Sequence, residues 1–376
     1  MLRMLKHLFT LLFLSFVFAI YSQDNTLRLN QIQIIASHNS YKKRPSEKEI
    51  KFLLKVKDKL GKENNPIALD YGHLPFDSQF TYFNVRGLEI DINPDPKGGF
   101  YYKRKINAFI HGLKQKSGVE ELKQPGLKVL HIKDVDYETN YYTFKQSLVA
   151  LKKWSDEHPN HLPMFINIES KDGAPGDESG LLRFAGFKRG IKFDLAQCDS
   201  IDSEIKSVFG NELKGLITPD AVRGNFTTLD EMATKNAWPL LNESRGKVVF
   251  IMEGGAVDSY LVNHTALKGR VMFVYSEPGK PEAAFVKRND ATRDKEKIKD
   301  LVKHGYIIRT RSDAETWEAR KNDYTDMNNA FESGAQITST DFYQPDLRFS
   351  TFQVKFPDAG AGRKNVINST GEALTE

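Results

Sequence analysis

Short, uninterrupted apolar runs recur along the chain. Strands buried on both faces of a parallel sheet read as continuous apolar runs rather than as alternating patterns. Eight segments fit this description, and they cover residues 32–37, 87–92, 127–131, 165–169, 247–252, 271–276, 306–311 and 336–340. We therefore expect eight parallel strands.

Helical periodicity lies between several of these runs. Phe144, Leu148, Leu151 and Trp154 recur every three or four residues, which predicts a helix between the third and fourth strands. The same spacing predicts a helix over residues 50–60 and another over 298–302 that stops at Gly305. Strand–helix alternation repeated eight times predicts an α/β protein with a (β/α)8 TIM barrel.

The longest interval between expected strands, about residues 172–245, predicts an insertion after the fourth strand. It opens with several Gly and Pro residues, and residues 229–232 suggest a short helix within it. Because loops that follow barrel strands gather at the catalytic face, we expect this insertion to influence substrate choice. The segment after Asp341 should be irregular, and the last dozen residues frayed.

The first 22 residues have the form of a secretory signal peptide. Arg3 and Lys6 precede an apolar run over residues 8–20, and small, polar residues then precede Gln23. A membrane anchor made of the same residues is the alternative. The signal predicts export to the periplasm or the medium, with residues 23–376 forming one barrel domain.

Composition narrows the choice of partner and compartment. The 376 residues are 40% hydrophobic and 27% charged, as in an ordinary globular protein, and a net charge of +5 is too small to favour nucleic acid. Cys198 is the single cysteine, so an exported form has no internal disulfide. The core alone must therefore stabilise the fold.

Polar side chains stand at the ends of four of the apolar runs. They are His38, Asn39, Glu89, Asp91, His131 and Glu169. Parallel barrels place their chemistry at the carboxyl ends of successive strands, so these side chains should meet at one mouth. Buried, unpaired charge is costly, and a shared cation is the simplest partner for several carboxylates.

The donor types at this mouth favour calcium. Glu89 and Asp91 are two apart on one strand and share a face, and Glu169 and the Asn39 amide complete an all-oxygen set. Pairing of the carboxylates with Lys or Arg is the alternative. Zinc is disfavoured, because the histidines lack zinc-motif spacing and the cysteine is alone.

Histidine and arginine residues supply candidate acid and phosphate-binding groups. His38 and His131 fit a general acid and a phosphate-contacting group, although a strand-end histidine is often structural. Arg309 and Arg311 share a strand face, and either binds phosphate or pairs with Asp313 or Asp341. Lys171 and Asp341 complete the candidate substrate-side set, which is Lys171, Arg309, Arg311 and Asp341.

Eight motifs in order resemble a known family. They include SHNSYK (37–42), RGLEIDI (86–92), KVLHIKDVDY (128–137), PMFINIESKD (163–172) and YIIRTRSDAET (306–316). The chain is similar to the calcium-dependent, phosphoinositide-specific phospholipase C-like proteins of bacteria and fungi, over nearly its whole mature length. The resemblance implies a phospholipase C-type phosphodiesterase barrel that binds Ca²⁺ and acts on a phosphoinositide lipid, in transient contact with a membrane surface and as a monomer.

The same resemblance implies roles for individual residues. The catalytic histidines fall on His38 and His131, and the metal ligands on Asn39, Glu89, Asp91 and Glu169. The inositol 2-hydroxyl would attack phosphorus and release diacylglycerol. Glu89 would also take the hydroxyl proton, His131 would protonate the leaving oxygen, and His38 would stabilise charge on the phosphoryl oxygen.

Other readings of the chain remain open at this stage. A glycerophosphodiester phosphodiesterase uses a similar barrel and metal, but usually begins its first motif with His-Arg-Gly, where this chain has His38-Asn39-Ser40. Metal-independent bacterial phosphatidylinositol phospholipases place an arginine at the cation position. A catalytically silent lipid- or glycan-binding barrel has no physical reason to retain all six polar residues at the mouth.

Overall fold

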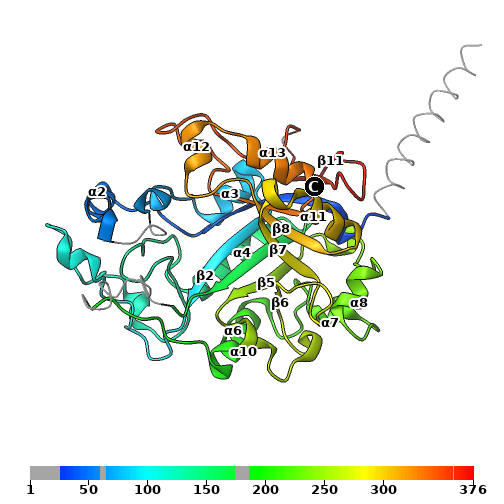
Figure 1. The fold of residues 1–376 in the computed structure, drawn as a ribbon. Helices are drawn as coiled ribbons and strands as arrows, with labels where there is room; N and C mark the ends of the chain where they lie inside the picture. Colours follow the sequence, from blue (N-terminus) through cyan, green and yellow to red (C-terminus); the bar gives the residue numbers. More distant parts are fainter. Residues whose placement is uncertain (1–25, 60–64, 174–185, 359) are drawn as a thin grey trace, which may run out of the picture.

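A parallel barrel forms the centre of the molecule. The computed structural model describes residues 26–59, 65–173, 186–358 and 360–376, so the expected signal peptide lies outside the described residues. Within those ranges eight strands pair in the order β6-β5-β4-β2-β1-β9-β8-β7, and a parallel bridge between Tyr275 and Phe285 joins the two end strands. The expected (β/α)8 barrel is confirmed (Figure 1).

The barrel strands follow the apolar runs closely. They are β1 (Ile32–Ser37), β2 (Gly87–Asn93), β4 (Met164–Ser170), β5 (Val248–Gly254), β6 (Phe273–Val274), β7 (Phe285–Asp290), β8 (Ile307–Arg311) and β9 (Ile337–Thr340). β2 and β4 stay in register over six residue pairs, from Gly87 opposite Phe165 to Ile92 opposite Ser170. This register places Glu89, Asp91 and Glu169 near one end of the barrel.

Two strand expectations were wrong. The run at 127–131 yields only β3 (Lys128–Val129), which pairs antiparallel with β2 outside the barrel order. The strand that replaces it is β7, whose last four of six residues are Lys287, Arg288, Asn289 and Asp290. A strand that ends in four polar residues does not read as a buried run, because its apolar part is only two residues long.

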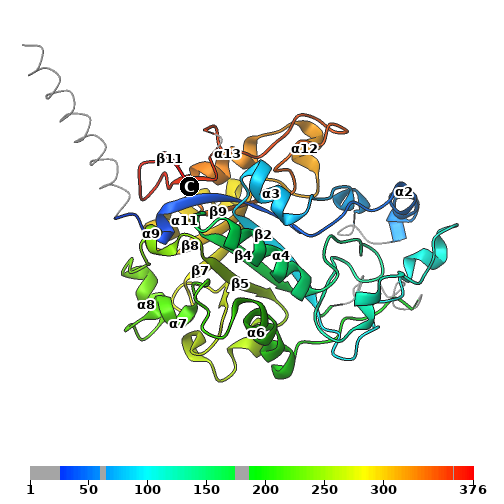
Figure 2. The ribbon, with the colours of Figure 1, turned by 180° about the vertical axis from the view of Figure 1, so that it is seen from behind.

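Helices cover the outside of the barrel (Figure 2). The α-helices are α2 (Glu47–Lys55), α3 (Phe76–Phe83), α4 (Phe144–Glu157), α6 (Leu195–Phe209), α7 (Pro219–Arg223), α8 (Leu229–Thr234), α9 (Leu241–Ser244), α10 (Val257–Leu261), α11 (Ala291–Lys303), α12 (Trp317–Lys321) and α13 (Thr325–Glu332). Short 3-10 turns are η1 (Leu29–Gln31), η2 (Lys57–Lys59), η3 (Pro66–Leu69), η4 (Ile106–Phe109), η5 (Glu120–Lys123) and η6 (Thr265–Leu267).

The helices that the sequence predicts are present. α4 begins at a Thr143–Gln146 capping box and buries the face that contains Leu148 and Leu151. α11 ends before Gly305, whose φ of 91° suits a residue without a side chain. α2 is shorter than expected, because it ends at Lys55. No helix in the described ranges is long and apolar enough to cross a membrane.

The C-terminal residues are ordered, contrary to the expectation of a frayed end. β10 (Gly362–Lys364) pairs antiparallel with β1, and β11 (Ala373–Leu374) pairs with β10. The Glu376 side chain forms an ion pair with Arg86 and accepts a hydrogen bond from the Leu162 amide at 2.6 Å. Pairing with a barrel strand compensates for the tail's low apolar content.

A second hydrophobic cluster lies outside the barrel core. Its buried members, here called the mouth cluster, are Ile50, Leu53, Leu69, Tyr101, Ile106, Ile110, Leu122, Leu130 and Tyr137. They come from segments that follow β1, β2 and β3 in the chain. Figure 1 shows α2 and these cyan loops beyond the strands at the left, away from the C-terminus. The loops of the mouth are therefore held by their own core.

Candidate active site

The catalytic candidates gather at the carboxyl ends of the strands. His38 and Asn39 follow β1, Glu89 and Asp91 belong to β2, and Glu169 is the next-to-last residue of β4. Below them the barrel is filled, since the cavity beside Glu89 has a volume of only about 10 Å³. Chemistry is therefore confined to the mouth.

His38 is held between two carboxylates. Its Nδ1 lies 2.7 Å from Asp341 Oδ1, and its Nε2 lies 3.3 Å from Glu89 Oε1. Burial alone would raise the pKa of Asp341, but the charges of His38 and Arg311 hold it well below its usual range. Asp341 is thus an ionised partner of His38, which places it behind the imidazole.

Asn39 turns the chain sharply after β1. Its φ of 48° is left-handed, a conformation that asparagine tolerates better than most residues. Its Nδ2 donates to the Tyr71 hydroxyl at 2.9 Å, so the amide oxygen points to the other side, where the Tyr41 hydroxyl lies 3.5 Å away. The amide oxygen has one weak donor and capacity for another ligand.

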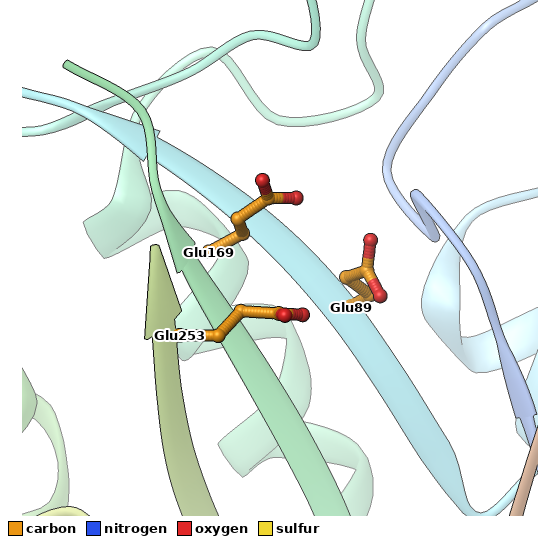
Figure 3. A group of neighbouring side chains, drawn as sticks. All are labelled: Glu89, Glu169 and Glu253. Carbon is orange, nitrogen blue, oxygen red and sulfur yellow. The ribbon is translucent and has the colours of Figure 1, made fainter. Parts of the chain in front are cut away.

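Three glutamates form an acidic cluster at the mouth. Ligand oxygens of Glu89, Glu169 and Glu253 all lie within 4.8 Å of one another, and Figure 3 shows the three side chains extending from adjacent strands toward one region. Burial opposes ionisation of Glu89, but the charges of His38 and Arg309 lower its pKa to about 2. Glu89 is therefore an anion at neutral pH.

Asp91 is a buried carboxylate of the site whose negative charge is poorly compensated. It is completely buried, and neither carboxylate oxygen has a hydrogen-bond partner within the part of the chain that the structure describes. Burial raises its pKa, the Lys171 charge opposes the rise, and the charges of Glu169 and Glu89 add to it. Its ion-pair partner is Lys171, whose Nζ lies 3.2 Å from Oδ2. A buried carboxylate that accepts no hydrogen bond is the kind of group that a further cation stabilises.

Glu253 was missed by the sequence analysis. It follows the apolar run of β5, which the expected strand ended at Met252, one residue too early. Its carboxylate accepts a hydrogen bond from Asn167 and forms an ion pair with Lys287. The signal was the same as for Glu169, an apolar run that ends on a carboxylate.

The basic candidates are paired with these carboxylates. Lys171 Nζ lies 2.7 Å from Glu169 Oε1 and 3.2 Å from Asp91 Oδ2. Arg309 forms an ion pair with Glu89. Arg311 NH2 lies 3.1 Å from Asp341 Oδ2, so the arginines combine positions at the mouth with partners among its acids.

His131 stands apart from the acidic cluster but has its own carboxylate. Its Nδ1 lies 2.7 Å from Asp136 Oδ2, and 17% of its side chain is exposed. Burial lowers its pKa, and the contact with Asp136 opposes the shift. With Nδ1 directed at Asp136, Nε2 is the nitrogen left for substrate.

The donor set fits calcium. It supplies carboxylate and amide oxygens, and the described part of the site includes neither a cysteine nor a histidine within the acidic cluster. The clearest sign that a cation belongs here is the buried Asp91 carboxylate, neither oxygen of which accepts a hydrogen bond from the described residues. Lys171 supplies part of that positive charge in the structure as it stands.

Comparison of the chain with known proteins identifies its family. A family model described as phosphoinositide phospholipase C, Ca²⁺-dependent, matches residues 27–366. No reviewed protein sequence is significantly similar to the chain.

Solved structures of low sequence identity share the fold. A calcium-dependent phosphoinositol-specific phospholipase C from a Pseudomonas species, in an apo form with myoinositol, aligns with a TM-score of 0.52 and 17% identity, over 91% of this chain and 96% of that one. Another crystal form of the same enzyme aligns with a TM-score of 0.52 and 15% identity, over 91% of this chain and 97% of that one. A Ca²⁺-dependent phosphatidylinositol-specific phospholipase C from Streptomyces antibioticus aligns less well and carries no weight for the fold: its TM-score is 0.48 and its identity 15%, over 84% of this chain and 95% of that one.

Proposed function

We propose that this chain, which belongs to the family of Ca²⁺-dependent phosphoinositide phospholipases C, cleaves a phosphoinositide lipid or a related inositol phosphodiester. In this reaction the inositol 2-hydroxyl attacks phosphorus, a cyclic phosphate forms and diacylglycerol leaves. The observation that carries the proposal is the pair of carboxylate-supported histidines, His38 with Asp341 and His131 with Asp136, on a mouth that also contains an acidic cluster.

Calcium would be held by Glu89, Asp91, Glu169 and the amide oxygen of Asn39. Asp91 accepts no hydrogen bond from the described residues, and Asn39 directs its nitrogen to Tyr71, which leaves the amide oxygen as a ligand. When bound, the cation lowers the pKa of the attacking hydroxyl and neutralises charge that develops on the phosphate. Glu253 stands beside this set with Lys287 as its counter-ion.

The side chains divide the two proton transfers between them. Glu89 is anionic at neutral pH and lies 3.3 Å from His38 Nε2, so it takes the 2-hydroxyl proton beside an imidazole that is oriented by Asp341. His38 also faces the phosphoryl oxygen as a donor. His131, with Asp136 on its Nδ1, gives a proton from Nε2 to the leaving oxygen.

The basic side chains suit a bound phosphate. Lys171, Arg309 and Arg311 line the mouth with charges that now balance Glu169, Glu89 and Asp341. With a cation held by the carboxylates, these three basic side chains would be available as donors to phosphate oxygens. Their pairing in the structure thus accords with a role in substrate binding.

A membrane surface is the partner that the mouth loops suit. Phe52, Phe109 and Phe187 stack with ring centroids 6.4 and 6.1 Å apart, and Phe109 is 49% exposed. Residues 96–119 contain no Asp or Glu, and their exposed or half-buried lysines are Lys97, Lys103, Lys105, Lys114 and Lys116. Aromatic rings beside lysines favour an anionic lipid surface.

Sedimentation with vesicles tests this surface. We expect Phe109→Ser to reduce binding to phosphatidylglycerol vesicles by about fivefold, the effect of losing a large apolar side chain from an interface. Tyr82→Ser on α3 is the matched control, since Tyr82 is 75% exposed and lies on a different helix. Equal binding by both variants would contradict the assignment.

Export follows from the expected signal peptide. Its residues lie outside the described ranges, so the proposal rests on the charged start and apolar run of the sequence. N-terminal sequencing of the protein from periplasm and medium tests it. A start near Gln23 supports export, and retention of Met1 in membranes supports an anchor instead.

Cleavage of phosphatidylinositol is the direct test of the activity. The protein is assayed with Ca²⁺ titrated against a chelator, and products are followed by phosphorus NMR. Calcium-dependent appearance of cyclic inositol phosphate is expected. Cleavage of glycerophosphodiesters instead would favour a glycerophosphodiesterase, and calcium binding without turnover of either would favour a silent barrel.

A further inference from the structure

Lys42 is a completely buried lysine next to the active site. Its ammonium donates to the carbonyl oxygens of Leu69 and Tyr71 at 2.9 and 2.7 Å, and it lies 3.3 Å from Asp136 Oδ2. It also lies 4.5 Å from the centroid of the Tyr71 ring. Burial lowers the pKa of Lys42, and the Asp136 charge opposes that shift.

The oxygen that Lys42 faces is the one that holds His131. Asp136 Oδ2 lies 2.7 Å from His131 Nδ1 and 3.3 Å from Lys42 Nζ. The other oxygen, Oδ1, has no hydrogen-bond partner among the residues that the structure describes. The direction of this carboxylate is therefore set by His131 on one side and by Lys42 on the other.

Lys42 is itself fixed from the His38 side of the mouth. Tyr71, whose carbonyl accepts from Lys42, places its hydroxyl 3.2 Å from His38 Nδ1. The Lys42 ammonium thus contacts the carboxylate of the His131–Asp136 pair directly and is linked to His38 through Tyr71. Burying an ammonium is costly, and the two carbonyls alone do not neutralise its charge. The Asp136 carboxylate supplies the compensating negative charge, so Lys42 and Asp136 depend on each other.

We propose that Lys42 is a positioning residue for His131, acting through Asp136, whose carboxylate it orients so that His131 presents Nε2 to the leaving oxygen. This rests on the proposed function, in which His131 gives its proton as the bond between phosphorus and the leaving oxygen breaks. The 2-hydroxyl oxygen forms the new bond to phosphorus, and its proton goes to Glu89.

A general acid matters only when the leaving group needs a proton. The alkoxide of diacylglycerol is a poor leaving group, whereas 4-nitrophenolate leaves without protonation. Loss of His131 orientation should therefore slow cleavage of phosphatidylinositol much more than cleavage of 4-nitrophenyl myo-inositol phosphate. Since acid catalysis contributes about 100-fold or more, we expect Lys42→Met to slow the lipid reaction about 30-fold and the nitrophenyl reaction less than threefold.

Lys128 offers a matched control within the same protein. It is also completely buried, donates to the carbonyls of Gln124 and Gly126, and lies 3.8 Å from Asp95 Oδ2. It touches neither histidine pair. Lys128→Met should lower stability and leave the ratio of the two rates unchanged, so equal changes in that ratio for both lysine variants would overturn the proposal.

Asp136→Asn and the double variant test whether Lys42 acts through Asp136. Asp136→Asn should show the same selective loss, and adding Lys42→Met to it should cost less than twofold more in the lipid reaction. Independent, multiplying losses would overturn the proposal. Lys42→Gln keeps a donor without the charge, and it replaces Lys42→Met if that variant does not fold.

A proton NMR signal gives a readout that does not depend on turnover. The Nδ1 proton of His131 that faces Asp136 should resonate far downfield, and Asp136→Asn identifies it by its loss. We expect Lys42→Met or Lys42→Gln to shift this signal upfield or abolish it, whether or not the wild type cleaves phosphatidylinositol. An unchanged signal overturns the role of Lys42. Absence of lipid cleavage in the wild type, with the signal sensitive to Lys42, overturns the proposed substrate alone.

Discussion

Asn167 donates its side-chain amide to two glutamates at once, to Glu89 Oε2 at 3.1 Å and to Glu253 Oε1. Asn167 belongs to β4, and its acceptors lie on the strands to either side, β2 and β5. One neutral donor thus separates two anions whose oxygens lie within 4.8 Å. Without it the two carboxylates would repel each other in a buried place.

Removing this donor should destabilise the protein in a way that calcium reverses. We expect Asn167→Ala to lower the free energy of unfolding by about 2 kcal/mol, the usual cost of losing a hydrogen bond to a charged group. Saturating Ca²⁺ should restore at least half of it, because the cation replaces the lost donor. Urea denaturation with and without Ca²⁺ measures both effects.

Asn365 provides the comparison for that measurement. Its Nδ2 donates to the neutral carbonyl of Gly334, on the far side of the barrel from the mouth. Asn365→Ala should also be destabilising, but Ca²⁺ should not offset its loss more than it stabilises the wild type. The same rescue in both variants would mean that Asn167 has no special connection to the acidic cluster.

Calcium affinity should depend more on Asp91 than on Glu253. Asp91 is buried and accepts no hydrogen bond among the described residues, although Lys171 forms an ion pair with it at 3.2 Å, whereas Glu253 both accepts a hydrogen bond from Asn167 and forms an ion pair with Lys287. We expect Asp91→Asn to weaken Ca²⁺ binding at least about tenfold, and Glu253→Gln by less than about threefold. Calorimetric titration with CaCl₂ compares them. The opposite order would replace Asp91 by Glu253 in the ligand set.

The stability of the protein should fall in mild acid because of His73. Burial lowers the pKa of His73 to about 4, and its Nε2 lies 2.8 Å from the His38 carbonyl. Between about pH 6.5 and 4 the unfolded chain binds a proton that the folded chain does not, so stability is full above pH 6.5 and falls as pH drops. The contribution is at most about 3 kcal/mol.

Comparison with His73→Gln isolates this contribution. Glutamine keeps a donor for the His38 carbonyl and does not titrate. Urea unfolding of the variant at pH 7 and pH 5 should give a smaller loss of stability than the wild type shows. An equal loss in the two proteins would assign the acid sensitivity to other groups.

Cys198 should report on unfolding. It is completely buried on α6, and burial raises its pKa to about 11. Thiolate is therefore scarce at pH 8 and shielded from reagents. We expect Ellman's reagent to react with the native protein at least 100-fold more slowly than with the protein in urea. Rapid reaction without denaturant would show that α6 opens locally.

The sequence was most informative where apolar residues recur along most of a strand. β1, β2, β4 and β5 are rich in apolar residues although polar residues such as Gln33 and Asn167 interrupt them, and four of the six polar candidates lie near the carboxyl ends of these strands. β7 was hidden because charged residues occupy half of it, and β3 was overrated because an apolar run says nothing about strand direction. Pairing partners come from tertiary contacts that local pattern does not encode.

Part of the site could be predicted from the sequence for the same reason. The spacing of Glu89 and Asp91 predicted that they share a face, but it did not predict which carboxylate each Lys or Arg side chain would contact. Arg309 pairs with Glu89 across the barrel, 220 residues away in the chain. Asp136 and Lys42 drew no attention, because neither ends a barrel strand. Their roles depend on loop geometry that only the folded structure displays.

The separate mouth cluster has a consequence for how the protein fails when heated. The loops that carry His131 and α2 are joined to one another by residues such as Leu130, Ile106 and Leu53, whereas the barrel has its own much larger core. A part of the molecule with its own small core forms a cooperative unit of lower stability, which opens before the main core. Activity should therefore vanish reversibly several degrees below the main calorimetric transition, and brief heating in that interval should yield an intact barrel with an inactive mouth.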